Sequence, residues 1–362
     1  MKNARRNLSL SIAASLFFIA AAFFIQLSCG MYEMSWAEIL DGVFCKELAS
    51  TTYFQYQLLG KTLAGALSIE APDLARAPTE ALIIWNVRIP RFLLGILIGV
   101  NLALAGCIFQ AVTRNAMSSA YTLGISQGSG LSMLLILIIW PSLHSWLPLL
   151  SMSGGIAAFA IVYAIAWSKG ASPTRLVLSG MILGSISVAV QKALYYFIKD
   201  ISTFQDVLSW TTGSLIGLSW TQLRMILPWT ILVLVFCLVF YKPLNLMMLG
   251  DAQAKSLGVA VEKWRLGFSL VGILAASSAV SAAGLIGFVG LIVPHICRSI
   301  VGSDHKSLFI ASMFCGASLL VFSDTVSRVI LPSGQIPVGI VMNTIGGLFF
   351  MFLMLKHKGA RC

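Results

Sequence analysis

The stretch GLIGFVGLIVPHICR, residues 284–298, is apolar enough to enter a lipid bilayer and carries one charged residue, Arg298, at its end. It is short for a membrane span, because an α-helix needs roughly 20 residues to cross the hydrocarbon core. It also contains three glycines and reaches Pro294 and His295 before the charge. This pattern predicts a short helix inside a membrane protein, and the segments around it decide the fold.

The whole chain is as apolar as this stretch. Of its 362 residues, 58% are hydrophobic and 10% are charged, and the mean hydropathy is +0.90. Soluble domains usually carry about a quarter charged residues. Because charges are missing from the long apolar runs, lipid must be the solvent for most of the chain. The sequence therefore predicts an all-α polytopic membrane protein.

The net charge of +11 does not indicate nucleic-acid binding, because the basic residues form no patch and lie at the ends of apolar runs. That placement is typical of cytoplasmic loops. The seven cysteines show no CxxC pair and no regular spacing, so neither a zinc site nor a disulfide framework is indicated. Cys29 and Cys45 could still meet outside the membrane.

Charge-free apolar runs predict about ten transmembrane helices. The uncharged stretch 115–168 is too long for one span, and WPSLHSWLP at 140–148 divides it into two. The uncharged stretch 266–297 is also too long, and small residues near 282–284 divide it. The other predicted spans are 8–28, 92–113, 175–197, 222–241, 307–326 and 336–355.

The N-terminal run 8–28 resembles a signal peptide, but it is long and lacks a small-x-small cleavage site, so we expect it to be retained as a span. Ten spans place both termini on one side of the membrane. Most Lys and Arg residues fall on that side, whereas the segment 31–87 carries seven acidic residues against three basic ones. By the positive-inside rule, both termini and the loop 242–265 are cytoplasmic, and 31–87 is an extracytoplasmic loop.

No catalytic or metal-binding pattern is found in the sequence. Gly60-Lys61-Thr62 resembles the end of a phosphate-binding loop, but Gln55 stands where an earlier glycine is required. The four histidines have no spacing typical of metal ligands. The chain is therefore predicted not to be an enzyme and to bind no metal or cofactor of its own.

Ion-coupled carriers usually need carboxylates buried within their spans. Asp324 is the acidic residue within a predicted span, near its outer end, and its (i, i+4) neighbour Arg328 could form a local ion pair with it. Asn101 and Gln110 are uncharged polar residues in the second span. They either form hydrogen bonds between helices or line a polar path through the bundle.

The stretch 284–298 and five further motifs resemble the FecCD family of bacterial ABC importer permeases for iron–siderophore complexes, haem and cobalamin. The resemblance covers about 85–362 and runs in the same order along the chain. The further motifs are RIPRFLLGILIGVNLALAGCIFQAVTRN (88–115), LGISQGSG (123–130), WTTGSLIGLSW (210–220), DTVSR (324–328) and PVGIVMNTIGG (337–347).

The resemblance implies a cobalamin-importer-permease-like fold in which 1–362 is a single transmembrane permease domain. It also implies a second permease copy or a paralogue, two cytoplasmic ATPase subunits that bind ATP and Mg, and an extracytoplasmic substrate-binding protein. Such a protein lies in the bacterial inner membrane, contacts lipid and no nucleic acid, and imports an iron chelate or a similar bulky metal-bearing ligand.

In the family, the stretch 284–298 is the short eighth helix, which leads back to the cytoplasmic face. Pro294 is expected to end that helix, because proline removes a helical hydrogen bond. Arg298 then suits the inner surface, and His295 is expected to be a structural hydrogen-bonding residue. Gly284 and Asn115, which belong to the matching motifs, are further candidates for structural or gating roles.

The loop 242–265 contains DAQAKSLG (251–258), which resembles the ATPase-coupling motif of importer permeases. A short helix broken by a glycine would fit a cleft on the ATPase subunit and carry its motion to the spans. Without the resemblance, the loop is a solvated amphipathic connection. The candidate coupling residues are Asp251, Ala252, Ala254, Leu257 and Gly258.

Arg88, Arg91 and Arg328 match positions where the family meets acidic residues of the binding protein. Arginines on the outer side run against the positive-inside bias, which favours a function for them, although they could also be ordinary interfacial arginines. The chain departs from the family pattern at Ala116-Met117, where Pro-Leu is usual. The turn after the second span is therefore expected to differ.

Two other classes of function compete with an ABC importer permease. An ion-coupled secondary carrier with ten spans would need a coupling carboxylate or a cation site within the membrane. An integral-membrane enzyme would need clustered polar groups at one depth. The sequence shows neither pattern.

Overall fold

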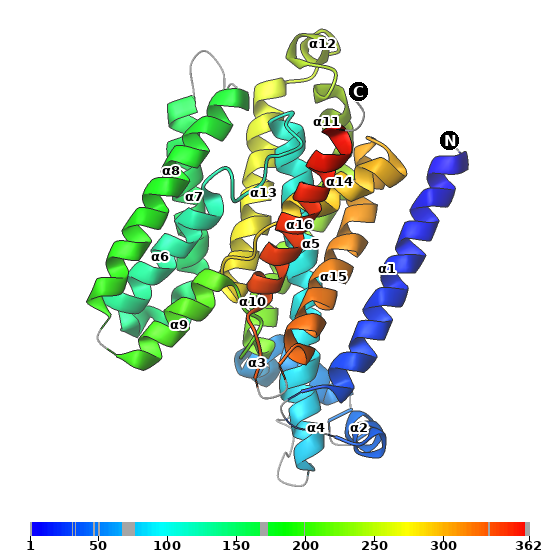
Figure 1. Ribbon diagram of the computed structural model, residues 1–362, viewed down its shortest axis with the longest axis vertical. Coiled ribbons are helices and arrows are strands. Elements are labelled where there is room, and N and C mark those ends of the chain that lie inside the picture. Colours follow the sequence, from blue (N-terminus) through cyan, green and yellow to red (C-terminus); the bar gives the residue numbers. More distant parts are fainter. Residues whose placement is uncertain are drawn as a thin grey trace.

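The protein is described by a computed structural model that covers residues 2–30, 32, 34–45, 48–49, 51–66, 77–166, 173–198, 200–331 and 334–358. Every regular element in this part of the chain is a helix (Figure 1). The long helices are α1 (Lys2–Ser28), α5 (Ile89–Val112), α7 (Leu147–Ala166), α8 (Pro173–Leu194), α10 (Trp220–Val239), α13 (Val261–Ala283), α15 (His305–Val329) and α16 (Val338–Lys358).

Shorter helices lie between the long ones. Two of them, α6 (Ile125–Ile139) and α14 (Val289–Val301), are apolar. The others are α2 (Trp36–Val43), α3 (Thr51–Ala66), α4 (Thr79–Ile83), α9 (Ile201–Thr212), α11 (Tyr241–Met247) and α12 (Asp251–Ser256), with a π turn η1 (Ile84–Arg88) and 3-10 turns η2 (Pro141–Trp146) and η3 (Tyr195–Phe197).

Within the described residues, eight helices are long and apolar enough to cross a membrane, and together with α6 and α14 they follow the order of the predicted runs. One boundary is different. The predicted span 92–113 continues outward through η1 and α4, so that Thr79–Val112 is helical throughout. Pro90 does not interrupt this helix. In the preceding π turn the backbone hydrogen bonds span five residues, and the Ile89 N–H donates to the Ile84 carbonyl. Residues 79–87, expected in the outer loop, therefore belong to this helix.

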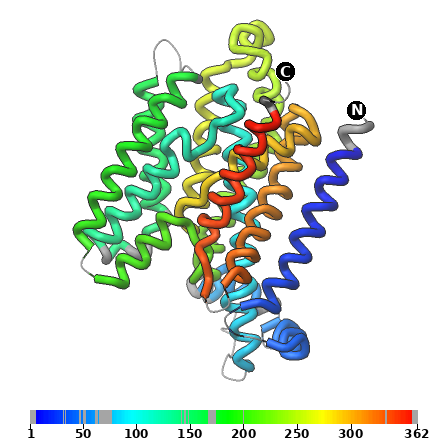
Figure 2. Tube along the Cα trace, viewed as in Figure 1, coloured from blue at the N-terminus to red at the C-terminus, as the bar shows by residue number. Residues whose placement is uncertain are grey.

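The two ends of the bundle carry different elements. The start of α1 and the end of α16 lie at one end, together with α11 and α12, and α2, α3 and α4 lie at the opposite end (Figures 1 and 2). We call these the inner and the outer end. The arrangement agrees with the prediction that 31–87 and 242–265 lie on opposite sides of the membrane.

Helix α5 forms the centre of the bundle and packs against α10, α13, α14 and α15. Its side chains from Ile98 to Val112 are all buried. Helix α1 stands at the edge, where it packs mainly on α15 and α14 (Figure 2). Only 11% of its apolar window is buried, so most side chains of α1 are exposed on the outside of the bundle.

The outer segment folds onto the outer end of the bundle. Helix α2 begins after Ser35, whose backbone N–H and hydroxyl donate to Glu38 at 2.7 and 2.9 Å and hold the pKa of that carboxyl below its usual value. Arg224 of α10 donates to the Gln57 carbonyl of α3 at 2.7 Å. Cys29 is not joined to Cys45 by a disulfide.

Candidate functional site

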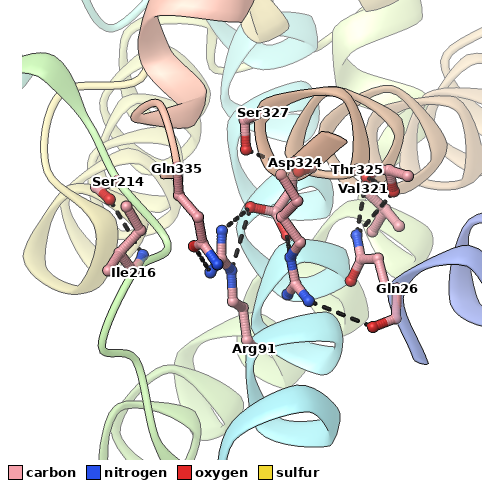
Figure 3. Close-up of polar contacts among 10 residues, drawn as sticks. Gln26, Arg91, Ser214, Ile216, Val321, Asp324, Thr325, Ser327 and Gln335 are labelled. Atoms are coloured by element: carbon pink, nitrogen blue, oxygen red, sulfur yellow. Dashed lines mark hydrogen bonds and ion pairs between the residues drawn. The ribbon is translucent and has the colours of Figure 1, made fainter. Parts of the chain in front are cut away.

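The outer end of the bundle holds a buried cluster of charged side chains (Figure 3). Asp324 of α15 accepts from Arg91 of α5, with Oδ1 and Nη2 2.6 Å apart, and from Arg328 one turn further on, with Oδ2 and Nε 3.2 Å apart. The three arginines expected at the outer rim are hidden, since Arg88 and Arg91 are 5% exposed and Arg328 is 7% exposed. The local ion pair with Arg328 is present, and Arg91 is a further partner that the sequence did not predict.

Two of these arginines also cap helix α1. Arg88 donates to the carbonyl of Leu27 and, at 2.6 Å, to that of Tyr32. Arg328 approaches the carbonyl of Gln26 at 3.5 Å. The last carbonyls of a helix have no partner within it, and cations are favourable there. Arg88, Arg91, Arg328 and Asp324, which we call the arginine cluster, therefore join α1, η1, α5 and α15 at the outer end.

Two glutamines complete the cluster (Figure 3). Gln335 accepts from Arg91 at 2.6 Å, and Gln26 donates to the Val321 carbonyl at 3.1 Å and to Thr325 Oγ1 at 2.9 Å. Sequence reasoning missed both. Gln26 could have been found as a polar residue within the first apolar run, whereas Gln335 lies in a loop whose path depends on the packed helices.

At the inner end, residues 241–258 form a short projecting unit of α11 and α12, which we call the coupling segment. Asp251 accepts two hydrogen bonds from Arg265 of α13, both at 2.9 Å, and lies 3.5 Å from Arg114. Ala254 is fully buried against Met247 and Val261. Asp251 and Ala254 therefore hold the coupling segment on the bundle.

The other residues of the predicted coupling motif face outward. Ala252 and Gly258 are exposed, and Leu257 is 58% exposed. Helix α12 ends at Ser256, and Gly258 then adopts φ +82°, a conformation that favours glycine. The expected helix broken by Gly258 is thus present, and its exposed residues are the ones available to another subunit.

A polar contact that the sequence did not suggest ties the coupling segment to α15. Asn245 of α11 donates to Asp304 at 2.7 Å and accepts from the backbone N–H of His305 at 2.9 Å. Asp304 is the N-cap of α15. A displacement of the coupling segment would therefore act on the first turn of α15 as well as on α13.

The prediction that Pro294 ends its helix is wrong. Helix α14 begins at Val289 and continues past Pro294 to Val301. Proline cannot donate to the carbonyl four residues earlier, which belongs to Gly290. Gln110 of α5 approaches the carbonyls of Gly290 and Leu291 at 3.4 and 3.5 Å. A side chain from a neighbouring helix thus replaces the missing hydrogen bond, and the helix continues.

A double-mutant cycle tests this role of Gln110. Gln110→Leu should lower the free energy of unfolding by about 1–2 kcal/mol, because it leaves a buried carbonyl without a donor. In a Pro294→Ala background the same change should cost less, since the alanine N–H can reach Gly290. Unfolding of the four proteins by SDS titration gives the coupling energy. Additive effects would show that Gln110 does not serve this carbonyl.

The remaining candidates at or near α14 are Gly284, His295 and Arg298, and each is packed against other parts of the bundle or lies in the helix itself. Gly284 ends α13 with φ +72°, and a Cβ there would lie 2.1 Å from the Trp210 carbonyl, so the position requires glycine. The His295 ring packs on Phe349 with centroids 6.2 Å apart. We find no hydrogen bond to the His295 ring among the described residues, so its aromatic contact stands in place of the expected hydrogen bond. Arg298 is half-buried in the last turn of α14.

Asn101 forms hydrogen bonds between helices, and Asn115 forms a local one. Asn101 is fully buried and donates to Thr230 of α10 at 2.8 Å and to Ser278 of α13 at 3.4 Å. This is the interhelical bonding considered from the sequence. Asn115 accepts from the Met117 N–H at 2.9 Å, which closes the turn after α5. Arg114 has φ +48° in that turn.

Within the described residues, no group of three or more His, Cys, Asp or Glu side chains could hold a metal ion. The two ends of the bundle are therefore the regions where charged and exposed residues gather: the arginine cluster outside and the coupling segment inside.

Comparisons with known proteins agree with this arrangement. The model of the FecCD transport family matches residues 16–356. The iron(3+)-hydroxamate import system permease protein FhuG of Bacillus subtilis (strain 168) is 35% identical over 287 residues, which are 76% of this chain and 84% of the relative. The hemin transport system permease protein HmuU of Yersinia pestis is 34% identical over 84% of this chain and 93% of its own length.

A solved structure of a metal-chelate type ABC transporter in an inward-facing conformation is also similar. It covers 95% of this chain and 98% of its own, with a TM-score of 0.77 and 27% identity. The fold and these relatives define the class, a multi-pass membrane protein of the ABC transporter permease type. The chain belongs to the FecCD transport family. The resemblance found in the sequence motifs is confirmed, and it begins earlier in the chain than residue 85.

Proposed function

We propose that the protein is the permease subunit of a binding-protein-dependent ABC importer. Its substrate is an iron chelate, such as a siderophore complex or haem, or a similar bulky metal-bearing ligand. The names of the relatives support this substrate class, since FhuG is named for iron(3+)-hydroxamate and HmuU for hemin. The observation that carries the proposal is the coupling segment, which is anchored to two long helices and projects from the inner end.

The coupling segment is the proposed contact with a cytoplasmic ATPase subunit. Its exposed residues include three large apolar side chains, with Leu249 and Leu257 each 58% exposed and Met248 40% exposed, beside polar residues such as Lys255. Exposed apolar residues gathered at one place indicate a protein contact. Because Asp251 is bound to Arg265 and Asn245 to Asp304, a push on this face is transmitted to α13 and α15.

The arginine cluster is the proposed contact with an extracytoplasmic binding protein. It has three arginines and one aspartate, and Arg328 Nη2 has no hydrogen-bond partner in the described part of the chain. An excess of positive charge attracts an acidic partner surface and orients it. Arg91 and Arg328 are paired with Asp324, whereas Arg88 binds only carbonyl oxygens and forms no ion pair in the described part of the chain, so its charge is the one that an acidic partner could pair with.

The proposed assembly places the chain in the bacterial inner membrane with both termini in the cytoplasm. A second permease copy or a paralogue completes the path for the substrate. ATP and Mg bind to the ATPase subunits, and this chain itself is neither an enzyme nor a cofactor-binding protein. The start of α1 and the end of α16 lie at the same end of the bundle, which supports placing both termini on one side of the membrane.

Reconstitution tests the function. Proteoliposomes that contain the permease and its ATPase, with the loaded binding protein outside, should accumulate an iron-labelled chelate only when ATP is enclosed. Omission of either partner should stop uptake. Accumulation at the same rate without the ATPase, driven by a proton or sodium gradient, would show a secondary carrier instead.

The same preparation tests the outer contact. Arg88→Gln should slow association of the binding protein at low salt, and the difference should shrink at high salt because the Debye length falls to about 3 Å at 1 M. Arg224→Gln is the matched control, since Arg224 is also an outer arginine that binds a carbonyl oxygen. Equal slowing by both variants would remove the specific role of Arg88.

A further inference from the structure

Helix α2 carries a row of exposed apolar side chains on one face. Trp36, Leu40 and Phe44 are each more than half exposed. They are four residues apart in the sequence, and Phe44 continues the helical turn, since its N–H donates to the Leu40 carbonyl at 3.0 Å. Side chains at this spacing are neighbours on a helix surface. The three residues therefore form one continuous apolar strip, which we call the α2 strip.

The α2 strip is not the face by which this helix packs on the protein. Ile39 and Gly42 are the buried residues of α2. Ile39 belongs to an apolar cluster with Leu27 at the end of α1 and Ile84 of η1. A Cβ on Gly42 would lie 2.8 Å from Ile84 Cδ1, so the glycine lets α2 approach η1 closely. The packing of α2 on the bundle is thus complete without the strip.

The order of side chains around α2 shows which way the strip faces. Val43 packs on the same cluster as Ile39, together with Phe23 of α1. At about 3.6 residues per turn, the strip follows directly after these two residues around the helix. The exposed carboxylates of Glu38 and Asp41 lie on the side opposite to the contact with α1. The apolar strip is therefore beside α1, and the charges point away from it.

Helix α2 also lies across the direction of the membrane helices. Figures 1 and 2 view it nearly along its axis, at the outer end of α1. Helix α1 is long and apolar enough to cross a membrane, and Phe24 and Ile25 near its outer end are exposed. The medium around such side chains is lipid. Because α2 packs on this end of α1, its strip lies where α1 leaves the hydrocarbon core.

This combination of position and composition is typical of a helix in the membrane interface. Such a helix lies in the plane of the membrane, with its apolar face buried about 5–10 Å into the boundary between headgroups and acyl chains. Tryptophan is enriched at this level. The carboxylates of α2 would remain in water on the other side. The exposed surface of α1 and the α2 strip are then covered by the same bilayer.

We propose that α2 is an interfacial helix whose strip, Trp36, Leu40 and Phe44, inserts into the bilayer leaflet at the outer end of the bundle. The partner of this face is the lipid surface itself. Insertion holds the connection between α1 and α2, in which the Tyr32 carbonyl accepts from Arg88. The contact does not depend on the proposed transport function.

Spin labels on the full chain in phosphatidylcholine vesicles test the proposal. Leu40→Cys and Phe44→Cys place a nitroxide on the strip, and Glu38→Cys and Asp41→Cys are matched controls on the other side of the same helix. The native cysteines are replaced by alanine, and each protein is first compared with the wild type by gel filtration. Collisions are measured with oxygen, which concentrates in lipid, and with a water-soluble nickel chelate. The ratio of oxygen to nickel collisions should be severalfold higher on the strip than at the controls.

Three results of the label scan would overturn the proposal. Frequent nickel collisions at all four positions would place α2 in water. Rare collisions with both reagents on the strip would mean that a second copy of the chain covers it. A preference for oxygen at all four positions would show that the label, and not the strip, draws the helix into lipid.

A photo-crosslinker in the chain with its native cysteines gives a second measurement that does not need the cysteine replacements. Leu40→p-benzoylphenylalanine in the same vesicles should yield, after illumination, a protein heavier by one phosphatidylcholine molecule. The same change at Glu38 should yield at least severalfold less of this adduct. Equal adduct from the two positions, or a crosslinked dimer from position 40, would contradict insertion of the strip.

Discussion

Replacing Asp324 with alanine is expected to lower the free energy of unfolding by about 3–5 kcal/mol, the range for breaking one side of a buried ion pair. Asp324 is 1% exposed and accepts from both Arg91 and Arg328, whose side chains are also buried. Its removal leaves two buried guanidinium groups without a counter-charge. SDS titration of the purified protein measures the loss.

Two variants show whether the unpaired charges cause this loss. Asp206→Ala removes an exposed carboxylate from α9 and should change the free energy of unfolding by less than about 0.5 kcal/mol. The triple variant Asp324→Leu, Arg91→Met, Arg328→Met removes Asp324 together with both of its ion-pair partners and should recover most of the stability. A triple variant as unstable as Asp324→Ala would mean that hydrogen bonds, not charge pairing, hold this end together.

The triple variant also separates folding from docking. If it folds and its binding protein associates as in the wild type, the two arginines are structural only. If it folds but association slows, they also attract the binding protein. A simple charge reversal of Arg91 could not make this distinction, because a glutamate there would face Asp324 in a buried position.

Replacing Gly258 with leucine is expected to reduce uptake about tenfold or more while the subunit still folds. A Cβ at Gly258 would meet no other atom of this chain within 4 Å, so added bulk projects from the coupling segment. Overpacking of an interface costs about 1–3 kcal/mol, and 1.4 kcal/mol is tenfold. Substrate uptake and ATP hydrolysis are measured in the same proteoliposomes.

Gly217→Leu is the matched control for this variant. Gly217 has φ +76° and open space around a Cβ, as Gly258 does, but it precedes α10 at the outer end. Both variants carry the same backbone strain of about 1–2 kcal/mol. Equal loss of uptake in the two would point to strain alone, and unchanged uptake in Gly258→Leu would remove the coupling segment from the mechanism.

The order of the membrane helices could be predicted from the sequence, because a charged side chain in the hydrocarbon core is costly in any span along the chain. A run without charges is therefore a local signal, and the helices α1, α10 and α15 lie close to the runs 8–28, 222–241 and 307–326. The break at Gly258 is local too, since it depends on the φ of one residue. These features need no knowledge of neighbours.

Whether a helix ends or continues at a proline could not be predicted from the sequence around that proline. Pro294 stays within α14 because Gln110 approaches the Gly290 carbonyl that the proline leaves unpaired, and Gln110 is 180 positions from Gly290 in the sequence. The extension of α5 back to Thr79 depends instead on the π turn before Pro90, in which the Ile89 N–H donates to the Ile84 carbonyl. Rules for isolated helices predict a break at both prolines; a side chain of another helix prevents it at Pro294, and the π turn prevents it at Pro90.

The state of the outer arginines was decided by the tertiary structure alone. The sequence showed Arg91 and Asp324 in separate motifs, 233 positions apart, and only the packing of α5 on α15 brings them to 2.6 Å. Motif matching found the residues but placed the arginines at an open rim. The burial and ion pairing of these arginines depend on which helices pack against each other. The hydrophobic runs are similar in all the helices, so they do not indicate which pairs pack together.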